Sequence, residues 1–318
     1  MFCQLLFLVV AKDSSTFQDI WIYLLGFDYG TTIELSEFYK IQNFDKDVDF
    51  ELGWAFYTKL LTLISSNNSV LLFFSGLIII HSYFNVIKKH SQIVWFSIFL
   101  FITIVFYNSL FVLRQNLATA ILLYSFPYII DRKFIKFLFV LLIAFLFHKT
   151  ALIFLVLYFV YPIKLNRKNI LLIIISSLVF SFLFIKVIEI VTTILTGFEV
   201  YSGGIGDSSI GNLTPLLISL TTLIFVILNF YPISKINGYE KLFFFMIFFM
   251  IIIDFSRIGL TGTMGRLNMY FAPALLILIP NACLKIKTPL LKYLSILLLG
   301  LLYLILMFNQ MNYGFELL

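Results

Sequence analysis

The chain has 318 residues, of which 61% are hydrophobic and 12% are charged, whereas a soluble domain has about 45–50% apolar and about 25% charged residues. This composition excludes a soluble enzyme and a disordered chain, and two cysteines are too few for a disulfide scaffold. The net charge of +6 does not indicate nucleic-acid binding, because the basic residues lie mainly in short loops between apolar segments. We therefore predict an all-α, polytopic integral membrane helix bundle that forms one transmembrane domain over residues 1–318.

The chain begins with an apolar stretch, residues 1–11, that is too short to span a membrane alone. It has no basic n-region and no small-residue cleavage site, so it does not resemble a signal peptide. We interpret it as a stub, either the outer half of a first helix or a short anchor. The polar segment that follows, residues 12–68, carries nine acidic side chains, and we expect it to be an outer loop with short helices.

Long apolar runs predict membrane-spanning helices, because within lipid a helix satisfies every backbone hydrogen bond inside its own segment. We expect such helices at about 69–87, 92–112, 115–131, 170–190, 214–233, 241–257, 266–283 and 288–309. A further apolar stretch, 134–162, is interrupted by His148 and Lys149, and it is too long for one span across a core of about 30 Å. Read as two short spans, 134–148 and 149–162, it brings the total to about ten.

The distribution of charge favours this division of 134–162. With two short spans, 13 Lys and Arg but only 2 acids lie on one side of the membrane, and 9 basic and 14 acidic residues lie on the other. Because Lys and Arg mark cytoplasmic loops, the loops at 12–68 and 196–213 are predicted to be periplasmic. The second of these is rich in glycine. His148 then lies near the outer face.

Four cationic side chains lie near the outer ends of different predicted spans: Arg114, Lys149, Arg257 and Arg266. A charge at the bilayer centre costs roughly 2.5–3.5 kcal/mol on insertion scales, so these residues should face the bundle or the interface. The planar fork of Arg suits the oxygens of phosphate. An anion site is one interpretation, and snorkelling to headgroups or pairing with Asp254 or Glu189 is the other.

His148 is a candidate general base, since an imidazole with its ordinary pKa of about 6.5 can take a proton from a hydroxyl near neutral pH. A structural, hydrogen-bonded histidine is the alternative. Acids and aromatic rings that suit sugar hydroxyls and ring faces lie close together in the first outer loop, at Asp49, Glu51, Trp54 and Tyr57, although a solvated loop would carry the same acids. The sequence has no nucleotide-binding or metal-ligand motif, so we predict neither a cofactor nor a metal.

Several stretches resemble one family. Residues Arg114-Gln115-Asn116-Leu117-Ala118 and Phe147-His148-Lys149-Thr150-Ala151 are similar to the Arg-Gln-x-Leu-Ala and Phe-His-Lys/x-Ser/Thr-Ala patterns of the EpsG family, relatives of Wzy-type O-antigen and exopolysaccharide polymerases. The acidic segment from Asp49 to Trp54 and the Arg266-Leu267-Asn268-Met269-Tyr270-Phe271 helix start resemble it more weakly. The matches run in order from about residue 49 to 271. The opening of the chain departs from the family, whose members usually begin with a complete first helix.

The resemblance implies a multi-pass glycosyltransferase of the bacterial inner membrane with its active site facing the periplasm. A growing glycan would move from its undecaprenyl diphosphate carrier to a sugar hydroxyl of an incoming lipid-linked unit. His148 and Arg114 would be catalytic, with diphosphate bound by Arg114, Lys149, Arg257 and Arg266, and acceptor glycan bound by Asp49, Glu51, Trp54 and Tyr57. The implied partners are the lipid-linked donor and acceptor, membrane lipid and a regulator of chain length, but no nucleic acid.

Two other functions stay open at this point. A flippase for the same lipid-linked sugars would have charged residues in mid-span, and the few candidates here lie towards the outer ends of their spans. A ligase that moves finished glycan to another acceptor needs the same donor, leaving group and cations as a polymerase. Only the family resemblance favours the polymerase.

Overall fold

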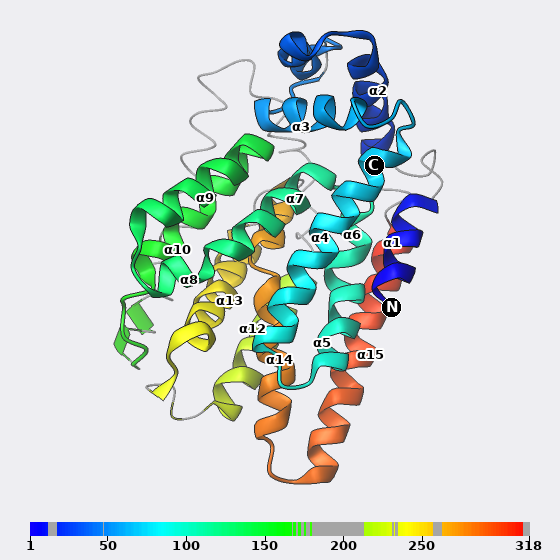
Figure 1. Ribbon diagram of the computed structural model, residues 1–318. Coiled ribbons are helices and arrows are strands. Elements are labelled where there is room, and N and C mark those ends of the chain that lie inside the picture. The colour runs from blue at the N-terminus through cyan, green and yellow to red at the C-terminus, as the bar shows by residue number, and fades with distance from the viewer. Residues whose placement is uncertain are drawn as a thin grey trace. The chain divides into compact units, whose positions relative to one another are not determined.

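The computed structural model describes residues 1–11, 18–46, 48–166, 213–230, 235–256 and 263–313, together with 168–169, 171–172, 175, 179 and 232. Every regular element in these ranges is a helix, which confirms the all-α prediction (Figure 1). The predicted span 170–190 and the predicted outer loop 196–213 lie almost wholly outside the described residues.

The chain divides into two compact units. The first comprises Met1–His90, Val94–Leu155 and Leu297–Leu318, and the second comprises Ser91–Ile93 and Val156–Ile296. Neither unit is a single contiguous segment. The expectation of one domain over 1–318 stays a prediction.

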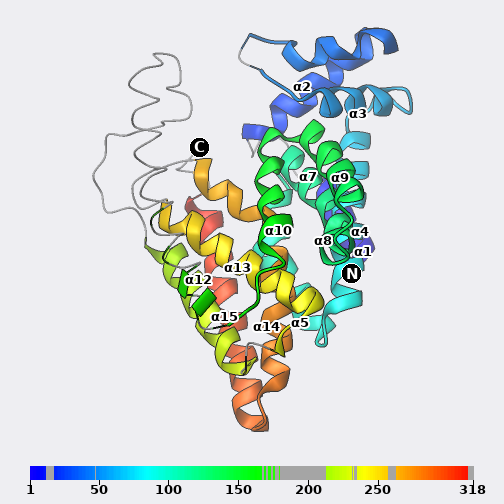
Figure 2. The same ribbon diagram turned by 90° about the vertical axis from the view of Figure 1, so that its left-hand side faces the viewer.

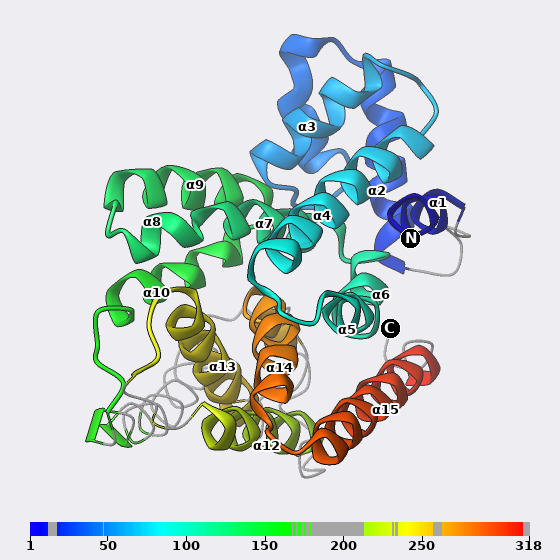
Figure 3. The ribbon, with the colours of Figure 1, turned by 60° about the horizontal axis from the view of Figure 1, so that its bottom comes forward.

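The N-terminal part of the first unit contains α1 (Phe2–Ala11), α2 (Gln18–Thr32), the 3-10 helix η2 (Leu35–Asn43) and α3 (Leu52–Thr62). The predicted stub is thus the helix α1, and it packs along α4 (Ser69–His90), where Val9 meets Gly76 (Figure 3). The next three elements, between residues 18 and 62, bury one another's aromatic side chains; Tyr23, Phe50 and Trp54 are in mutual contact.

The rest of the first unit is a set of shorter helices. They are α5 (Val94–Leu100), the π-helical turn η3 (Phe101–Phe106), α6 (Tyr107–Ser109), α7 (Leu113–Leu122), the 3-10 turn η4 (Leu123–Ser125), α8 (Phe126–Ile130), α9 (Phe134–Phe147) and the 3-10 helix η5 (Lys149–Phe154). A tight turn at Asp131–Lys133, with Arg132 in the left-handed region at φ 58°, reverses the chain after α8. As a result α9 packs back along α7 (Figures 2 and 3).

The second unit contains α12 (Thr214–Asn229), α13 (Gly238–Ser256), the 3-10 helix η8 (Thr263–Tyr270) and α14 (Pro273–Lys285), and α12, α13 and α14 pack against one another. Two helices cross the boundary between the units: α10 (Leu155–Val160) and α15 (Pro289–Tyr313). Phe243 to Ile247 of α13 and Leu276 to Ile279 of α14 are almost completely buried. Such continuous burial explains why these stretches are apolar all round.

By length and hydropathy, two of the described helices are able to cross a membrane, Ser69–His90 and Pro289–Asn309. Six other described apolar helices have only 10–17 residues, and α13, with 19 residues, includes Glu240, Lys241 and Asp254. The π-helical turn η3 divides the 92–112 stretch, and the 3-10 turn η4 divides the 115–131 stretch ahead of Pro127. The number of about ten spans therefore stays a prediction.

Candidate functional site

The candidate site is built around the helix break at His148, between α9 and η5. Helix α9 ends at Phe147, and His148 adopts an extended conformation with φ −159° and ψ 120°. The backbone N–H of His148 donates to the carbonyl of Ala144 at 3.0 Å, and its own carbonyl accepts from Ala151 at 3.0 Å, where η5 begins. The structure thus has a helix break at His148, whereas the two membrane spans on either side of it stay a prediction. The break turns the imidazole away from the helical repeat.

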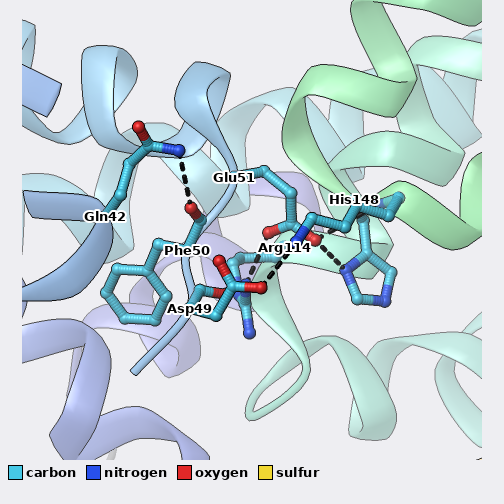
Figure 4. A network of polar contacts seen from close by, with 7 residues as sticks. Gln42, Asp49, Phe50, Glu51, Arg114 and His148 are labelled. Atoms are coloured by element: carbon cyan, nitrogen blue, oxygen red, sulfur yellow. Dashed lines mark hydrogen bonds and ion pairs between the residues drawn. The ribbon is translucent and has the colours of Figure 1, made fainter. Parts of the chain in front are cut away.

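The side chain of Glu51 lies at the centre of the site (Figure 4). Its Oε1 is 2.9 Å from Nδ1 of His148 and accepts the backbone N–H of Lys149 at 3.1 Å. Its Oε2 accepts from a terminal nitrogen of Arg114 at 2.5 Å. Glu51 precedes the first turn of α3, Arg114 is in the first turn of α7, and His148 follows α9. Three segments far apart in sequence therefore meet at one carboxylate.

The environment of Glu51 keeps its carboxylate ionised. Burial by itself would raise the pKa of Glu51, but the hydrogen bond with His148 and the positive charge of Arg114 outweigh it and lower the pKa from 4.5 to about 2. An ionised carboxylate has no proton to donate and can only accept hydrogen bonds. All three groups that contact Glu51 must therefore act as donors towards it.

Arg114 is held on several sides. Besides its bond to Glu51 it donates to the backbone carbonyl of Asp49 at 3.2 Å. Its guanidinium lies over the ring of Phe50 at 4.8 Å and that of Tyr23 at 5.6 Å, which adds cation–π attraction. The side chain is 19% exposed, and within the part of the chain that the structure describes its Nε is buried without a hydrogen-bond partner.

Lys149 takes part in a different kind of ion pair. Its Nζ is 2.5 Å from Oδ2 of Asp49, and the two side chains are 55% and 70% exposed. An exposed pair of this kind contributes only about 0–1 kcal/mol, because water screens both charges. An incoming anion can therefore displace Asp49 from Lys149 at small cost, whereas the pair between Glu51 and Arg114 is much less exposed.

Two local features bring Glu51 to His148. Gly53 of α3 lies directly against Leu146 of α9, and a Cβ on residue 53 would be 2.7 Å from both Cβ and the carbonyl oxygen of Leu146. Only glycine allows the two helices to approach this closely. The extended residues before Glu51 are tied to η2, because Gln42 and Phe50 exchange two hydrogen bonds of 3.0 and 2.9 Å (Figure 4).

The residues predicted to bind acceptor glycan have different surroundings. Asp49 is exposed, but the carboxylate of Glu51 is only 6% exposed and has three donors on it. Trp54 is completely buried beside Tyr23 and Phe50, so neither face of its ring is open to a sugar. The hydroxyl of Tyr57 lies 3.2 Å from that of Ser75. Of the four, Asp49 is the one whose carboxylate is largely exposed, and acceptor binding by Asp49 and Tyr57 stays a prediction, whereas the burial of Glu51 and Trp54 speaks against a direct contact with glycan.

The remaining predicted cations are Arg257 and Arg266. Arg257 lies outside the described residues, and Arg266 is in η8 of the second unit. In that unit Asp254, one of the acids considered as a partner for an outer cation, is buried and accepts from Ser219 and Asn268 at 2.5 Å each. The structure thus brings together Asp49, Glu51, Arg114, His148 and Lys149.

Sequence reasoning missed that Glu51 binds Arg114 and His148. The sequence did contain an indication of this pairing. The cations Arg114 and Lys149 and the acids Asp49 and Glu51 were all predicted to lie on the same side of the membrane. The acids also suited sugar hydroxyls, so their residue type did not decide between these roles. Within the described ranges, no group of three or more His, Cys, Asp or Glu side chains is placed to hold a metal ion.

Comparison with known proteins identifies the family. No curated protein sequence and no solved structure matches the chain. The model of the EpsG family matches residues 17–316, a range that includes every residue of the cluster around Glu51. We conclude that this chain belongs to the EpsG family.

Proposed function

We propose that this protein is a membrane glycosyltransferase that polymerises undecaprenyl diphosphate-linked oligosaccharide repeat units into O-antigen or a capsular or exopolysaccharide on the periplasmic face of the bacterial inner membrane. Membership of the EpsG family supports a function of the polysaccharide-polymerase type. The observation that carries the proposal is that His148, at the break after α9, and Arg114 both contact the carboxylate of Glu51. This arrangement offers a base beside fixed cations.

The proposed reaction is a displacement at the anomeric carbon of the donor glycan. The oxygen of an acceptor hydroxyl forms a bond to that carbon, and the bond from the carbon to the phosphate oxygen breaks. The lipid diphosphate leaves with the bonding electrons, and the hydroxyl proton passes to Nε2 of His148. The energy is already stored in the phosphoester bond, so the reaction needs no nucleotide.

Cations would stabilise the charge that develops on the leaving diphosphate. Lys149 is the best placed of the described candidates, because its present partner Asp49 is exposed and easily displaced. Arg114 would act from behind Glu51, and we propose that Arg257 and Arg266 add further positive charge. Once released from Lys149, Asp49 is available to the hydroxyls of the acceptor.

The test is a polymerisation assay with purified protein and lipid-linked repeat units. We expect a ladder of products at repeat-unit spacing, which His148→Ala abolishes. His81→Ala is the matched control, because His81 is exposed on α4, and the ladder should persist. Movement of the lipid across a liposome bilayer without a ladder would indicate a flippase. Transfer of one preformed glycan to another acceptor without a ladder would indicate a ligase.

A further inference from the structure

We infer that Glu51 is a positioning residue that holds the imidazole of His148 as the Nδ1–H tautomer, so that Nε2 carries the lone pair that takes the acceptor's proton. This inference rests on the proposed function, since it assigns the orientation of the proposed base. Glu51 itself touches neither glycan nor diphosphate in this assignment. Its contacts with Arg114, His148 and Lys149 carry the inference.

The tautomer follows from which groups are able to donate. Oε1 of Glu51 lies 2.9 Å from Nδ1 of His148, and an ionised carboxylate only accepts. Nδ1 must therefore carry the proton in this contact. In a neutral imidazole the other nitrogen, Nε2, is then the basic one. With its side chain 24% exposed, His148 is accessible to a substrate while its inner nitrogen is bound.

Arg114 determines which way the carboxylate faces. A guanidinium has donors and no acceptor, and it binds Oε2 of Glu51 at 2.5 Å. The backbone N–H of Lys149 donates to the opposite oxygen, Oε1, at 3.1 Å. With a donor on each oxygen and only 6% exposure, the carboxylate has little freedom to turn away from the imidazole.

Replacing Glu51 with Gln should reverse the tautomer. The amide of Gln has one accepting oxygen and one donating NH₂ group. Arg114 and the backbone N–H of Lys149 can both only donate, and they lie on opposite sides of the carboxyl group. The charged guanidinium makes the stronger hydrogen bond, so we expect it to take the amide oxygen and to turn the NH₂ group towards His148, with loss of the contact to Lys149. Nδ1 must then accept, which places the proton on Nε2 and removes the lone pair needed for the reaction. The variant is nearly isosteric, but it also removes the negative charge beside Arg114, so its stability is measured alongside its kinetics.

The experiment combines ¹⁵N-histidine spectra with kinetics on the full-length protein in lipid nanodiscs. The signals of His148 are assigned by their loss in His148→Ala, at a pH where the imidazole is neutral. We expect Nδ1–H in the wild type and Nε2–H in Glu51→Gln. For synthetic lipid-linked donor and acceptor, kcat should fall about 10²-fold in Glu51→Gln while the donor KM stays within about threefold, because a misdirected tautomer affects the chemical step.

Glu51→Asp keeps the negative charge beside Arg114. It serves as a second test of the inference if Glu51→Gln does not fold. Its shorter side chain should lower kcat about tenfold while the Nδ1–H tautomer and the donor KM are retained. Glu37→Gln is the control, since Glu37 is an acid of η2 that pairs with Lys40, and it should leave tautomer and kcat unchanged.

The outcomes separate this inference from the proposed function. If His148→Ala keeps full activity, the proposed base is wrong whatever Glu51 does. If His148→Ala is inactive but Glu51→Gln keeps wild-type kcat or the Nδ1–H tautomer, only the positioning role of Glu51 is overturned. A normal kcat in Glu51→Asp overturns it equally, should Glu51→Gln fail to fold.

Discussion

At the scale of single residues, the site contains two ion pairs in contrasting environments. Glu51 and Arg114 are mostly buried, and removing one partner of such a pair leaves an uncompensated charge at a cost of about 3–5 kcal/mol. Asp49 and Lys149 are largely exposed, and their pair contributes about 0–1 kcal/mol. We therefore assign Arg114 to holding Glu51 and Lys149 to binding the donor.

This assignment predicts opposite effects for two similar substitutions. Arg114→Met should lower the free energy of unfolding by about 3–5 kcal/mol, because it leaves the carboxylate of Glu51 without its cation. Lys149→Met should change it by no more than about 1 kcal/mol and should instead raise the KM for the lipid-linked donor. Chemical unfolding in detergent and initial rates measure the two quantities. Equal losses of stability in both variants would contradict the distinction.

The pKa of Glu51 predicts how stability depends on pH. The pKa of this carboxyl in the folded protein, about 2, is below its ordinary 4.5, so the stabilisation is fully present above pH 4.5 and is lost as the pH falls towards 2. The loss should amount to a few kcal/mol. In practice, the difference in unfolding free energy between wild type and Glu51→Gln should shrink over this range. A difference that is constant with pH would show that folding does not lower the pKa of Glu51.

At the scale of secondary-structure elements, the position of α3 depends on its contact with the end of α9. Gly53 is where the two helices touch, and it lies two residues after Glu51. The far end of α3 is fixed separately, because the buried ammonium of Lys59 donates to the carbonyls of Gly30 and Ile33 at the end of α2. Glu51 is thus placed by backbone contacts as well as by its own hydrogen bonds.

Gly53→Ala should therefore damage the site without changing any polar group. The new methyl group meets backbone atoms of Leu146, which cannot rotate away, so α3 must shift from α9. We expect a loss of about 1–3 kcal/mol in stability and a fall in kcat as Glu51 moves away from His148. Gly300→Ala is the control, since a Cβ there has ordinary contacts of 3.6 and 3.7 Å. Wild-type kcat in Gly53→Ala would show that the spacing of α3 and α9 is not critical.

The sequence was most informative where one physical constraint dominated. The length limit on a membrane span and the charge of His148 and Lys149 were enough to predict the break after α9. The π-helical turn η3 could not be foreseen, because residues 94–109 contain neither Gly nor Pro to mark it. Burial of Trp54 depends on how α2 packs against α3, which local composition does not encode.

At the scale of the whole molecule, the predicted topology depends on the parity of its membrane crossings. Within the first unit, Glu51 joins the start of α7 to the end of α9. The basic turn Asp131–Lys133 connects the end of α8, which follows α7 and η4, to the start of α9. The cluster of His148, Lys149 and Arg114 therefore lies at one end of α9, and the basic turn lies at the other end. If the chain folds back at His148 on the outer side of the membrane, the basic turn is on the cytoplasmic side. The positive-inside rule predicts that the Asp131–Lys133 end is cytoplasmic.

Fusions of alkaline phosphatase, which is active only outside the cytoplasm, test this topology. We expect activity after Asn67 and none after Lys133 or Lys168, because the hairpin at His148 returns the chain to the cytoplasmic side. Lys133 is the matched control, since it stays cytoplasmic whether 134–162 crosses the membrane once or folds back. Activity after Lys168 would show that this stretch crosses once. His148 would then lie inside the bilayer, away from acceptor sugars, and the proposed reaction would lose its base.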